Sequence, residues 1–114
     1  MQIIPQSIPE ILSFKPNVIR EERGFFVETM RRSLLCDANL PNLIQHNQSR
    51  SKFGVIRGLH YQLDQPQGKL VRCSYGKVFD VAVDIRKSSP TFGKSVTKIL
   101  DDVNHEQLWI PKGF

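Results

Sequence analysis

Short apolar runs separated by turn residues recur along the chain, and only one stretch has helical spacing. Residues 31–40 are predicted to form that helix, with Leu34 and Leu35 facing a core. Before it, residues 18–30 are predicted to be extended, with a turn at Gly24. The front of the chain is therefore expected to be an extended segment followed by one short helix.

Everything after the helix is predicted to consist of strands and turns. The expected strands span residues 43–50, 55–62, 69–75, 77–85, 93–100 and 108–110. Gly76 is a hairpin-type turn signal between two of them. Alternation along 77–85 places Phe79, Val81, Val83 and Ile85 on one face, and Asp80, Ala82 and Asp84 on the other.

Many short strands with a single helix predict an all-β sandwich or barrel, and we favour a jelly roll. The chain has 114 residues, which suits one domain rather than two, so residues 1–114 are expected to form a single domain. The sequence ends at Phe114, directly after a strand and a turn. We therefore expect the fold to be incomplete at its C-terminus.

Composition and charge narrow the function classes. The apolar fraction of 39% and charged fraction of 24% suit a globular protein. We expect no signal peptide, no membrane partner and a cytoplasmic location, with Cys36 and Cys73 as reduced thiols. The net charge is +5, but the basic residues are scattered. That distribution fits a small polyanion in a pocket better than a nucleic-acid track.

Unusually polar strands mark the candidate site. Gln45 and Asn47 share one face of a predicted strand, and His60 and Gln62 share one face of the next. A plain apolar core cannot hold these groups, because each buried polar atom needs a partner. These side chains, together with Arg57, are expected to be solvated or to line a pocket.

Several blocks of the sequence resemble the dTDP-4-dehydrorhamnose 3,5-epimerase family. They are Arg23-Gly24-Phe25-Phe26-Val27-Glu28, Gln45-His46-Asn47-Gln48-Ser49, Gly54-Val55-Ile56-Arg57-Gly58-Leu59-His60-Tyr61-Gln62, Gly68-Lys69-Leu70-Val71-Arg72-Cys73, Val78-Phe79-Asp80-Val81-Ala82-Val83-Asp84-Ile85-Arg86, Ser89-Pro90-Thr91-Phe92-Gly93 and Gln107-Leu108-Trp109-Ile110-Pro111-Lys112-Gly113-Phe114. They occur in family order and cover nearly the whole chain. The resemblance implies a cupin-type jelly roll, or double-stranded β-helix, and a homodimer in which N-terminal strands cross to the partner. The implied substrate is a dTDP-4-keto-6-deoxyhexose, inverted at C3 and C5.

The resemblance also implies a role for each candidate residue. Proton removal beside a carbonyl needs a base, a cation or donor at the carbonyl oxygen, and an acid on the opposite ring face. His60 matches the family's base, and Lys69 matches the group that stabilises the enolate oxygen. The substrate-binding positions are matched by Arg23, Glu28, Gln45, His46, Asn47 and Arg57. His46 stands where the family often has an acidic residue, and Asp80 and Asp84 fit a structural or a supporting role.

The sequence departs from two motifs of related proteins, and each departure changes what we expect of activity or metal binding. The family's proton donor is a tyrosine whose motif neither Tyr61 nor Tyr75 matches, so we expect this chain alone to be poorly active. In metal-binding cupins the first motif carries two histidines, whereas Gln62 replaces the second one here. We therefore expect no bound metal and no cofactor.

Three alternatives stay open. The chain could be an epimerase acting at a single carbon or on another dTDP-keto-sugar. From a different class, it could be a non-catalytic cupin fragment that binds a sugar nucleotide. Nucleic-acid binding is the weakest alternative, because no exposed aromatics are interleaved with the basic residues.

Overall fold

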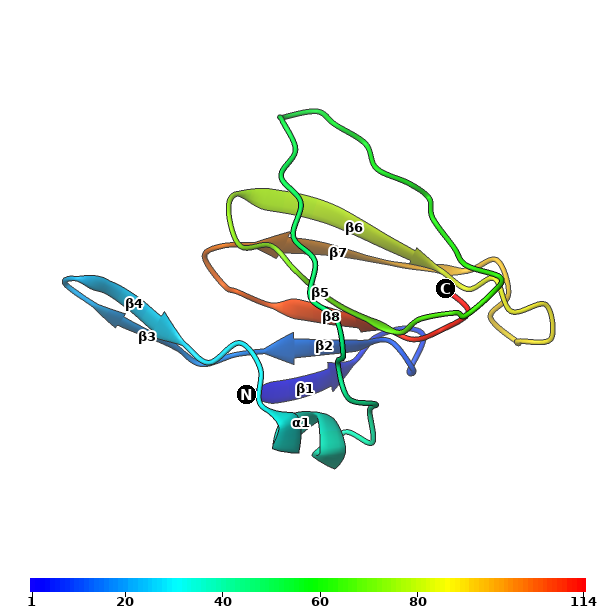
Figure 1. Cartoon of the computed structure of the whole chain (residues 1–114), viewed down its shortest axis with the longest axis horizontal. Coiled ribbons are helices and arrows are strands. Elements are labelled where there is room, and N and C mark those ends of the chain that lie inside the picture. The colour runs from blue at the N-terminus through cyan, green and yellow to red at the C-terminus, as the bar shows by residue number, and fades with distance from the viewer.

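The structure is a computed structural model that describes residues 1–114. It is built almost entirely of short strands. The elements are β1 (Gln2–Pro5), β2 (Leu12–Lys15), β3 (Val18–Glu21), β4 (Gly24–Val27), α1 (Arg32–Asp37), β5 (Lys69–Arg72), β6 (Lys77–Val83), β7 (Ser95–Asp101) and β8 (Gln107–Ile110) (Figure 1). The six-residue α1 is the single helix, and no helix has the length and apolar character that crossing a membrane requires.

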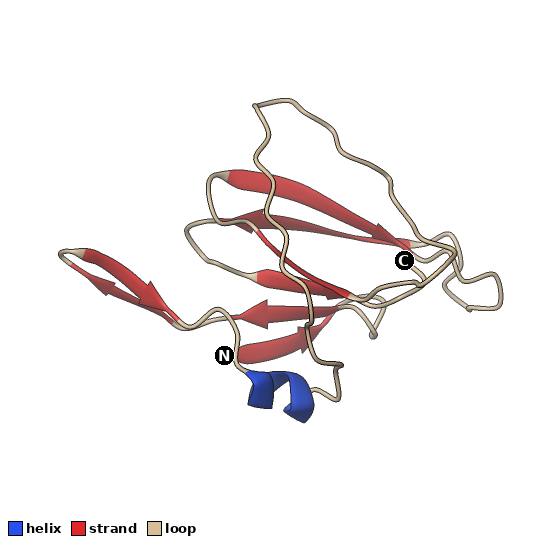
Figure 2. Ribbon diagram, viewed as in Figure 1, coloured by secondary structure: helices blue, strands red, loops and turns tan.

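The strands form three antiparallel sheets (Figure 2). The largest has the order β1-β2-β8-β5, and the other two are the hairpins β3–β4 and β6–β7. The β6–β7 hairpin lies over the four-stranded sheet, whereas the β3–β4 hairpin projects away from both (Figure 1). The body is thus two layers with an arm.

The core lies between the β6–β7 hairpin and the four-stranded sheet. Its buried members are Ile8, Ile11, Cys73, Ala82, Val96, Leu100 and Leu108, with Val71, Ile110 and Phe114 packed against them. Ala82 on β6 and Asp84 just after it are buried on one face, while Phe79 on the opposite face of β6 is 67% exposed. The face that carries two aspartates therefore points inward.

The front of the chain agrees with its prediction. Residues 18–30 contain the β3–β4 hairpin, in which Glu21 pairs with Gly24 across a two-residue turn. Gly24 has φ 136°, a backbone conformation that favours glycine. The predicted helix is confirmed but shorter, and Leu35 is buried while Leu34 is half-buried.

The two strands predicted at 43–50 and 55–62 are wrong. No strand forms between α1 and β5, and residues 43–62 have one backbone hydrogen bond among themselves, from Val55 N to Lys52 O at 3.4 Å. A strand needs a partner for its N–H and C=O groups, and sequence alternation does not reveal whether one is present. In the structure these groups face solvent along a long excursion of the chain (Figure 1).

Two further corrections concern pairing. Gly76 does form a turn, with φ 75°, but β5 pairs with β8 and β6 pairs with β7. The turn therefore passes the chain from one layer to the other and does not make a hairpin. Strands β1 and β2 were not predicted, and they pair with each other before β2 joins β8.

A buried carboxylate fixes the turn that follows β6. Asp84 is fully buried and accepts hydrogen bonds from Arg86 Nε at 2.9 Å, Arg86 Nη2 at 2.8 Å, Ser89 Oγ at 2.5 Å and Thr91 Oγ1 at 2.6 Å. The Arg86 guanidinium, followed by the two hydroxyls, holds the pKa of Asp84 far below its ordinary value. Arg86 also lies 4.6 Å over the Phe114 ring, which ties the C-terminal residue to this turn.

Candidate active site

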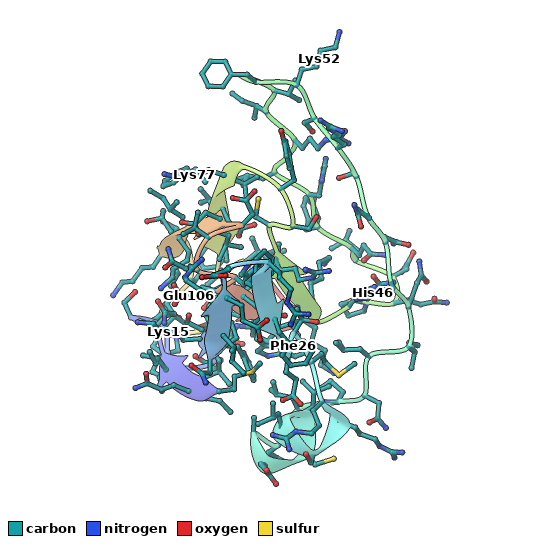
Figure 3. All side chains as sticks on the ribbon, turned by 90° about the vertical axis from the view of Figure 1, so that its left-hand side faces the viewer. Lys15, Phe26, His46, Lys52, Lys77 and Glu106 are labelled. Carbon is teal, nitrogen blue, oxygen red and sulfur yellow. The ribbon has the colours of Figure 1, made fainter.

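The predicted site residues lie on three separate parts of the chain. Arg23 is in the tip of the β3–β4 hairpin and Glu28 follows β4. Lys69 begins β5. The segment between α1 and β5 carries the other five, which are Gln45, His46, Asn47, Arg57 and His60. In Figure 3 this segment, with His46 along it and Lys52 at its far end, stands away from the strands.

All eight predicted residues are exposed, and their contacts are local. Gln45 Nε2 donates to Asn47 Oδ1 at 3.2 Å, and Arg57 Nε donates to Ser51 Oγ at 2.7 Å. Lys69 Nζ donates to Gln67 O at 3.5 Å. These contacts stay within the long segment or at its junction with β5.

Two predicted residues form ion pairs near the hairpin. Arg23 Nη2 lies 2.6 Å from Glu21 Oε2, and Glu28 Oε1 lies 3.4 Å from Arg31 Nε. His60 takes part in no hydrogen bond or ion pair. The structure thus brings Gln45 and Asn47 together but does not join His60 to Lys69, Arg23 or Glu28.

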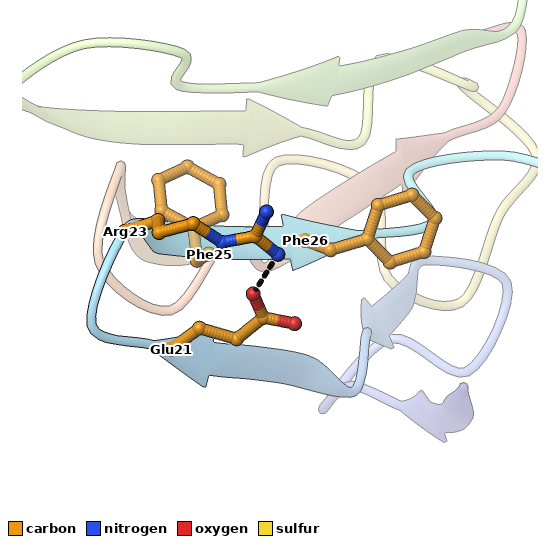
Figure 4. A pocket seen from close by; sticks show the side chains of 5 residues that line it. Glu21, Arg23, Phe25 and Phe26 are labelled. Carbon is orange, nitrogen blue, oxygen red and sulfur yellow. Dashed lines mark hydrogen bonds and ion pairs between the residues drawn. The ribbon is translucent and has the colours of Figure 1, made fainter.

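The hairpin tip encloses a shallow cavity of about 370 Å³. It is lined by Glu21, Arg23, Gly24, Phe25 and Phe26 (Figure 4). A guanidinium and an aromatic ring beside each other suit a ligand that carries both an anionic group and a planar base. Arg23 was predicted to bind substrate, and Phe26, which lines the same cavity, is 65% exposed.

Sequence reasoning missed a polar cluster inside the molecule. Lys98 Nζ lies 2.7 Å from Glu106 Oε1, and Ser13 Oγ donates to the same carboxylate. Burial acts to raise the pKa of Glu106, but the hydrogen bonds from Lys98 and Ser13 outweigh it, so the pKa is lowered. Asp80 pairs with Lys98 across β6–β7, and burial raises its pKa.

Alternation along 77–85 gave the one available signal for this cluster, because it set Asp80 on the face shared with Ala82 and Asp84. Ser13 is on β2 and Glu106 lies just before β8, so only the pairing of β2 with β8 brings them together. No group of three or more His, Cys, Asp or Glu residues is arranged to hold a metal ion. The expectation of a metal-free site stays a prediction.

Comparison with known proteins identifies the family. Residues 5–114 match the family described as dTDP-4-dehydrorhamnose 3,5-epimerase. A protein of that name from Shigella flexneri is 54% identical over 117 aligned positions, which cover all of this chain and 65% of the relative. The chain therefore spans about two thirds of that relative's length.

Solved structures agree in fold. A dTDP-6-deoxy-D-glucose-3,5-epimerase from Legionella pneumophila, in complex with dTDP-4-keto-L-rhamnose, is 49% identical with a TM-score of 0.95, over 99% of this chain and 61% of that one. A dTDP-4-dehydrorhamnose 3,5-epimerase from Sulfolobus tokodaii is 45% identical with a TM-score of 0.91, over 100% and 66%. The predicted all-β, cupin-type jelly-roll class is confirmed. The chain belongs to the dTDP-4-dehydrorhamnose 3,5-epimerase family.

Proposed function

We propose that this chain supplies the proton-abstracting base and the enolate-stabilising group of a 3,5-epimerase. Such an enzyme converts dTDP-4-dehydro-6-deoxy-D-glucose to dTDP-4-dehydro-L-rhamnose. The observation that carries the proposal is the family match over residues 5–114, which includes both His60 and Lys69. The Legionella relative with its bound dTDP-4-keto-L-rhamnose supports the substrate class. No cofactor is required, because the C4 ketone already makes its neighbouring hydrogens acidic.

The chemistry assigns a task to each group. His60 accepts the proton from C3 or C5, and the electron pair of the broken C–H bond moves through the C4 carbonyl to its oxygen. The Lys69 ammonium stabilises the enolate oxygen. Return of a proton to the same carbon from the opposite ring face inverts it, and an acid other than His60 must supply that proton.

Binding falls to the remaining candidate residues. Arg23 and Arg57 suit the diphosphate, because a guanidinium binds oxygen pairs with its planar fork. Glu28, Gln45, His46 and Asn47 supply further polar contacts. For His60 and Lys69 to act on one sugar, the segment between α1 and β5 has to bring His60 to the start of β5.

Solvent exchange tests the base directly. The protein is incubated in D₂O with the keto-sugar nucleotide, and deuterium at C3 and C5 is followed by NMR and mass spectrometry. We expect incorporation by the unsubstituted chain and a loss of about 100-fold or more in His60→Asn. Lys69→Met should slow exchange while the affinity for dTDP is retained.

The same experiment decides between the candidate functions. Exchange at one carbon only favours a single-carbon epimerase. Binding of dTDP with no exchange above the His60→Asn background refutes the catalytic proposal and favours a non-catalytic sugar-nucleotide-binding cupin. Absence of both binding and exchange refutes both.

We further propose that the protein works in the cytoplasm as a homodimer. Both cysteines carry free thiols, which suits a reducing compartment. Exposed apolar side chains on the hairpin and on β6–β7 offer surface for a second copy, including Phe26 at 65% and Phe79 at 67% exposure.

A further inference from the structure

His105 is the one buried side chain whose polar atoms have no partner within the protein. The residue is 5% exposed, and neither Nδ1 nor Nε2 makes a hydrogen bond. Its backbone has φ 53°, in the left-handed region. A buried polar ring without partners disfavours folding, so its position calls for a reason other than stability.

The ring of His105 contacts the β3–β4 hairpin. Its centroid lies 4.5 Å from that of Phe25, with the two planes at 40°. Next to it, Arg20 Nη2 of β3 donates to Val103 O at 2.7 Å. The arm is therefore held against the turn between β7 and β8 by one aromatic contact and one charged hydrogen bond, 80 or more residues away in sequence.

The segment between β7 and β8 that carries His105 is held in place by several hydrogen bonds. The Asp101 carboxylate accepts hydrogen bonds from Asn104 N at 2.7 Å and Val103 N at 3.1 Å. These backbone hydrogen bonds, that of Asn104 first, lower the pKa of Asp101. The turn is also bound to the β5–β6 turn, because Gly76 N donates to Asp102 Oδ2 at 2.7 Å.

A third contact holds the exit of the arm. The side chain of Gln107, which is 2% exposed, donates through Nε2 to Thr29 O just after β4. Gln107 and His105 are two residues apart, so one short stretch anchors the arm at its exit and partway along its length. Without the His105 contact, the arm would keep the hydrogen bonds of Arg20 to Val103 O and of Gln107 to Thr29 O but would lose its aromatic contact with the turn.

His105 contacts the arm through Phe25, and Phe26 on the same strand faces the other way. Phe25 and Phe26 are adjacent on β4, so their side chains leave opposite faces of the strand, and their rings point apart in Figure 4. Phe25 meets His105 and also borders the cavity, whereas Phe26 is open to solvent and lines the cavity together with Arg23.

We propose that His105 is a positioning residue that docks the β3–β4 arm on the β7–β8 turn, and so presents Arg23 and Phe26 to a nucleoside diphosphate. This inference rests on the proposed function. Only the docked arm binds with full affinity, so the apparent Kd equals the intrinsic Kd divided by the docked fraction. Losing the His105 ring lowers that fraction and weakens binding without touching the ligand.

The test compares three variants with the unsubstituted protein. His105→Asn removes the ring but keeps a residue type that tolerates positive φ. His105→Phe keeps the ring and removes the two unpartnered nitrogens. Val96→Ala is the control for general destabilisation, because it thins the core away from the arm. Two readouts are used: hydrogen exchange of the amides in residues 18–27, and the Kd for dTDP by calorimetry.

We expect His105→Asn to speed exchange in the arm and to raise the Kd by about two- to tenfold, the range of an aromatic contact. His105→Phe should restore both values. Val96→Ala should speed exchange in β6 and β7 while leaving the dTDP Kd within about twofold.

The outcomes separate the inference from the function it rests on. No binding of dTDP by the unsubstituted protein refutes the proposed function and the inference together. Equal binding by the unsubstituted protein and His105→Asn, or unchanged exchange in the arm, refutes the inference alone. Failure of His105→Phe to rescue also counts against it, since the ring is the feature held responsible.

Discussion

Asp84 shows how one buried residue can organise a turn. Its carboxylate is fully buried, accepts bonds from three different side chains, and anchors Arg86, which also lies 3.1 Å from Glu10. A buried charge is tolerated only when it is paired and hydrogen-bonded. Of the structural and supporting roles that the sequence left open for Asp84, these contacts favour the structural one.

Replacing this carboxylate should destabilise the fold. Asp84→Asn leaves Arg86 without its buried counter-charge, and Arg86 is partly exposed, so we expect a loss of about 2 kcal/mol. Urea unfolding followed by far-UV circular dichroism measures it. Glu10→Gln is the matched control, because it removes the exposed partner of the same guanidinium and should change little. Equal effects of the two variants would contradict the assignment.

The same group predicts acid sensitivity. Hydrogen bonds from Arg86 lower the folded-state pKa of Asp84 below the ordinary value of 3.8. The unfolded chain therefore takes up a proton first as pH falls, and Asp84's contribution, complete above about pH 5, declines below that. Unfolding midpoints measured from pH 7 to pH 2.5 should fall, and the fall should be smaller in Asp84→Asn.

At the scale of elements, Gly68 marks where the long segment rejoins the sheet. A Cβ built on Gly68 would lie 2.7 Å from Cζ2 of Trp109 and closer still to Cη2. Trp109 is buried on β8, so its indole cannot move aside freely. The missing side chain of Gly68 thus permits the start of β5 to lie against β8.

A methyl group at this position should be costly. Gly68→Ala is expected to destabilise the chain by about 1–3 kcal/mol through overpacking, measured as a lower urea midpoint. Gln67→Ala, at an exposed neighbour, should stay near the unsubstituted value. A Gly68→Ala protein as stable as that control would mean that the indole yields.

Some elements could be predicted from sequence and others could not, for physical reasons. The β3–β4 hairpin and α1 follow from local signals, a glycine turn and helical spacing. Strand β6 follows from alternation, and β7 was expected as a short strand between turn residues. Strands β1 and β2 are only four residues each, so they offer too little pattern. Residues 43–62 carry strand-like sequence, but pairing depends on a partner that sequence does not locate.

The candidate site shows the same division. Short sequence motifs identified Arg23, His60 and Lys69, because residues that act on the substrate lie in local blocks that resemble the family's motifs. They could not show whether these residues meet, since that depends on how the long segment lies. His105 and Glu106 gave no motif at all, because their importance comes from contacts with Phe25 and Ser13, far away in the chain.

At the scale of the whole molecule, few residues are buried. Only 15 of 114 residues are buried, so much apolar surface remains available for other contacts. Phe79 and Ile99 pair across β6 and β7 on the outer face, and they are 67% and 56% exposed. Adjacent apolar side chains on an open sheet face favour association.

Association should therefore depend on concentration and on this face. We expect sedimentation velocity of the unsubstituted chain to show a dimer whose fraction increases with protein concentration. The double variant Phe79→Ser and Ile99→Ser should shift the distribution towards monomer. A control with Thr97→Ser on the same face should sediment like the unsubstituted chain. A strictly monomeric unsubstituted chain would contradict the homodimer proposal.

The place of Trp109 has one more consequence. It is the only tryptophan in the chain, and its indole rests against Gly68, where the long segment returns to the sheet. Its fluorescence therefore arises from a single known position, beside the groove that Pro66, Gly68 and Pro111 help to line. The emission maximum of this one residue serves as a built-in optical reporter, whose red shift would signal water reaching the seam between segment and sheet.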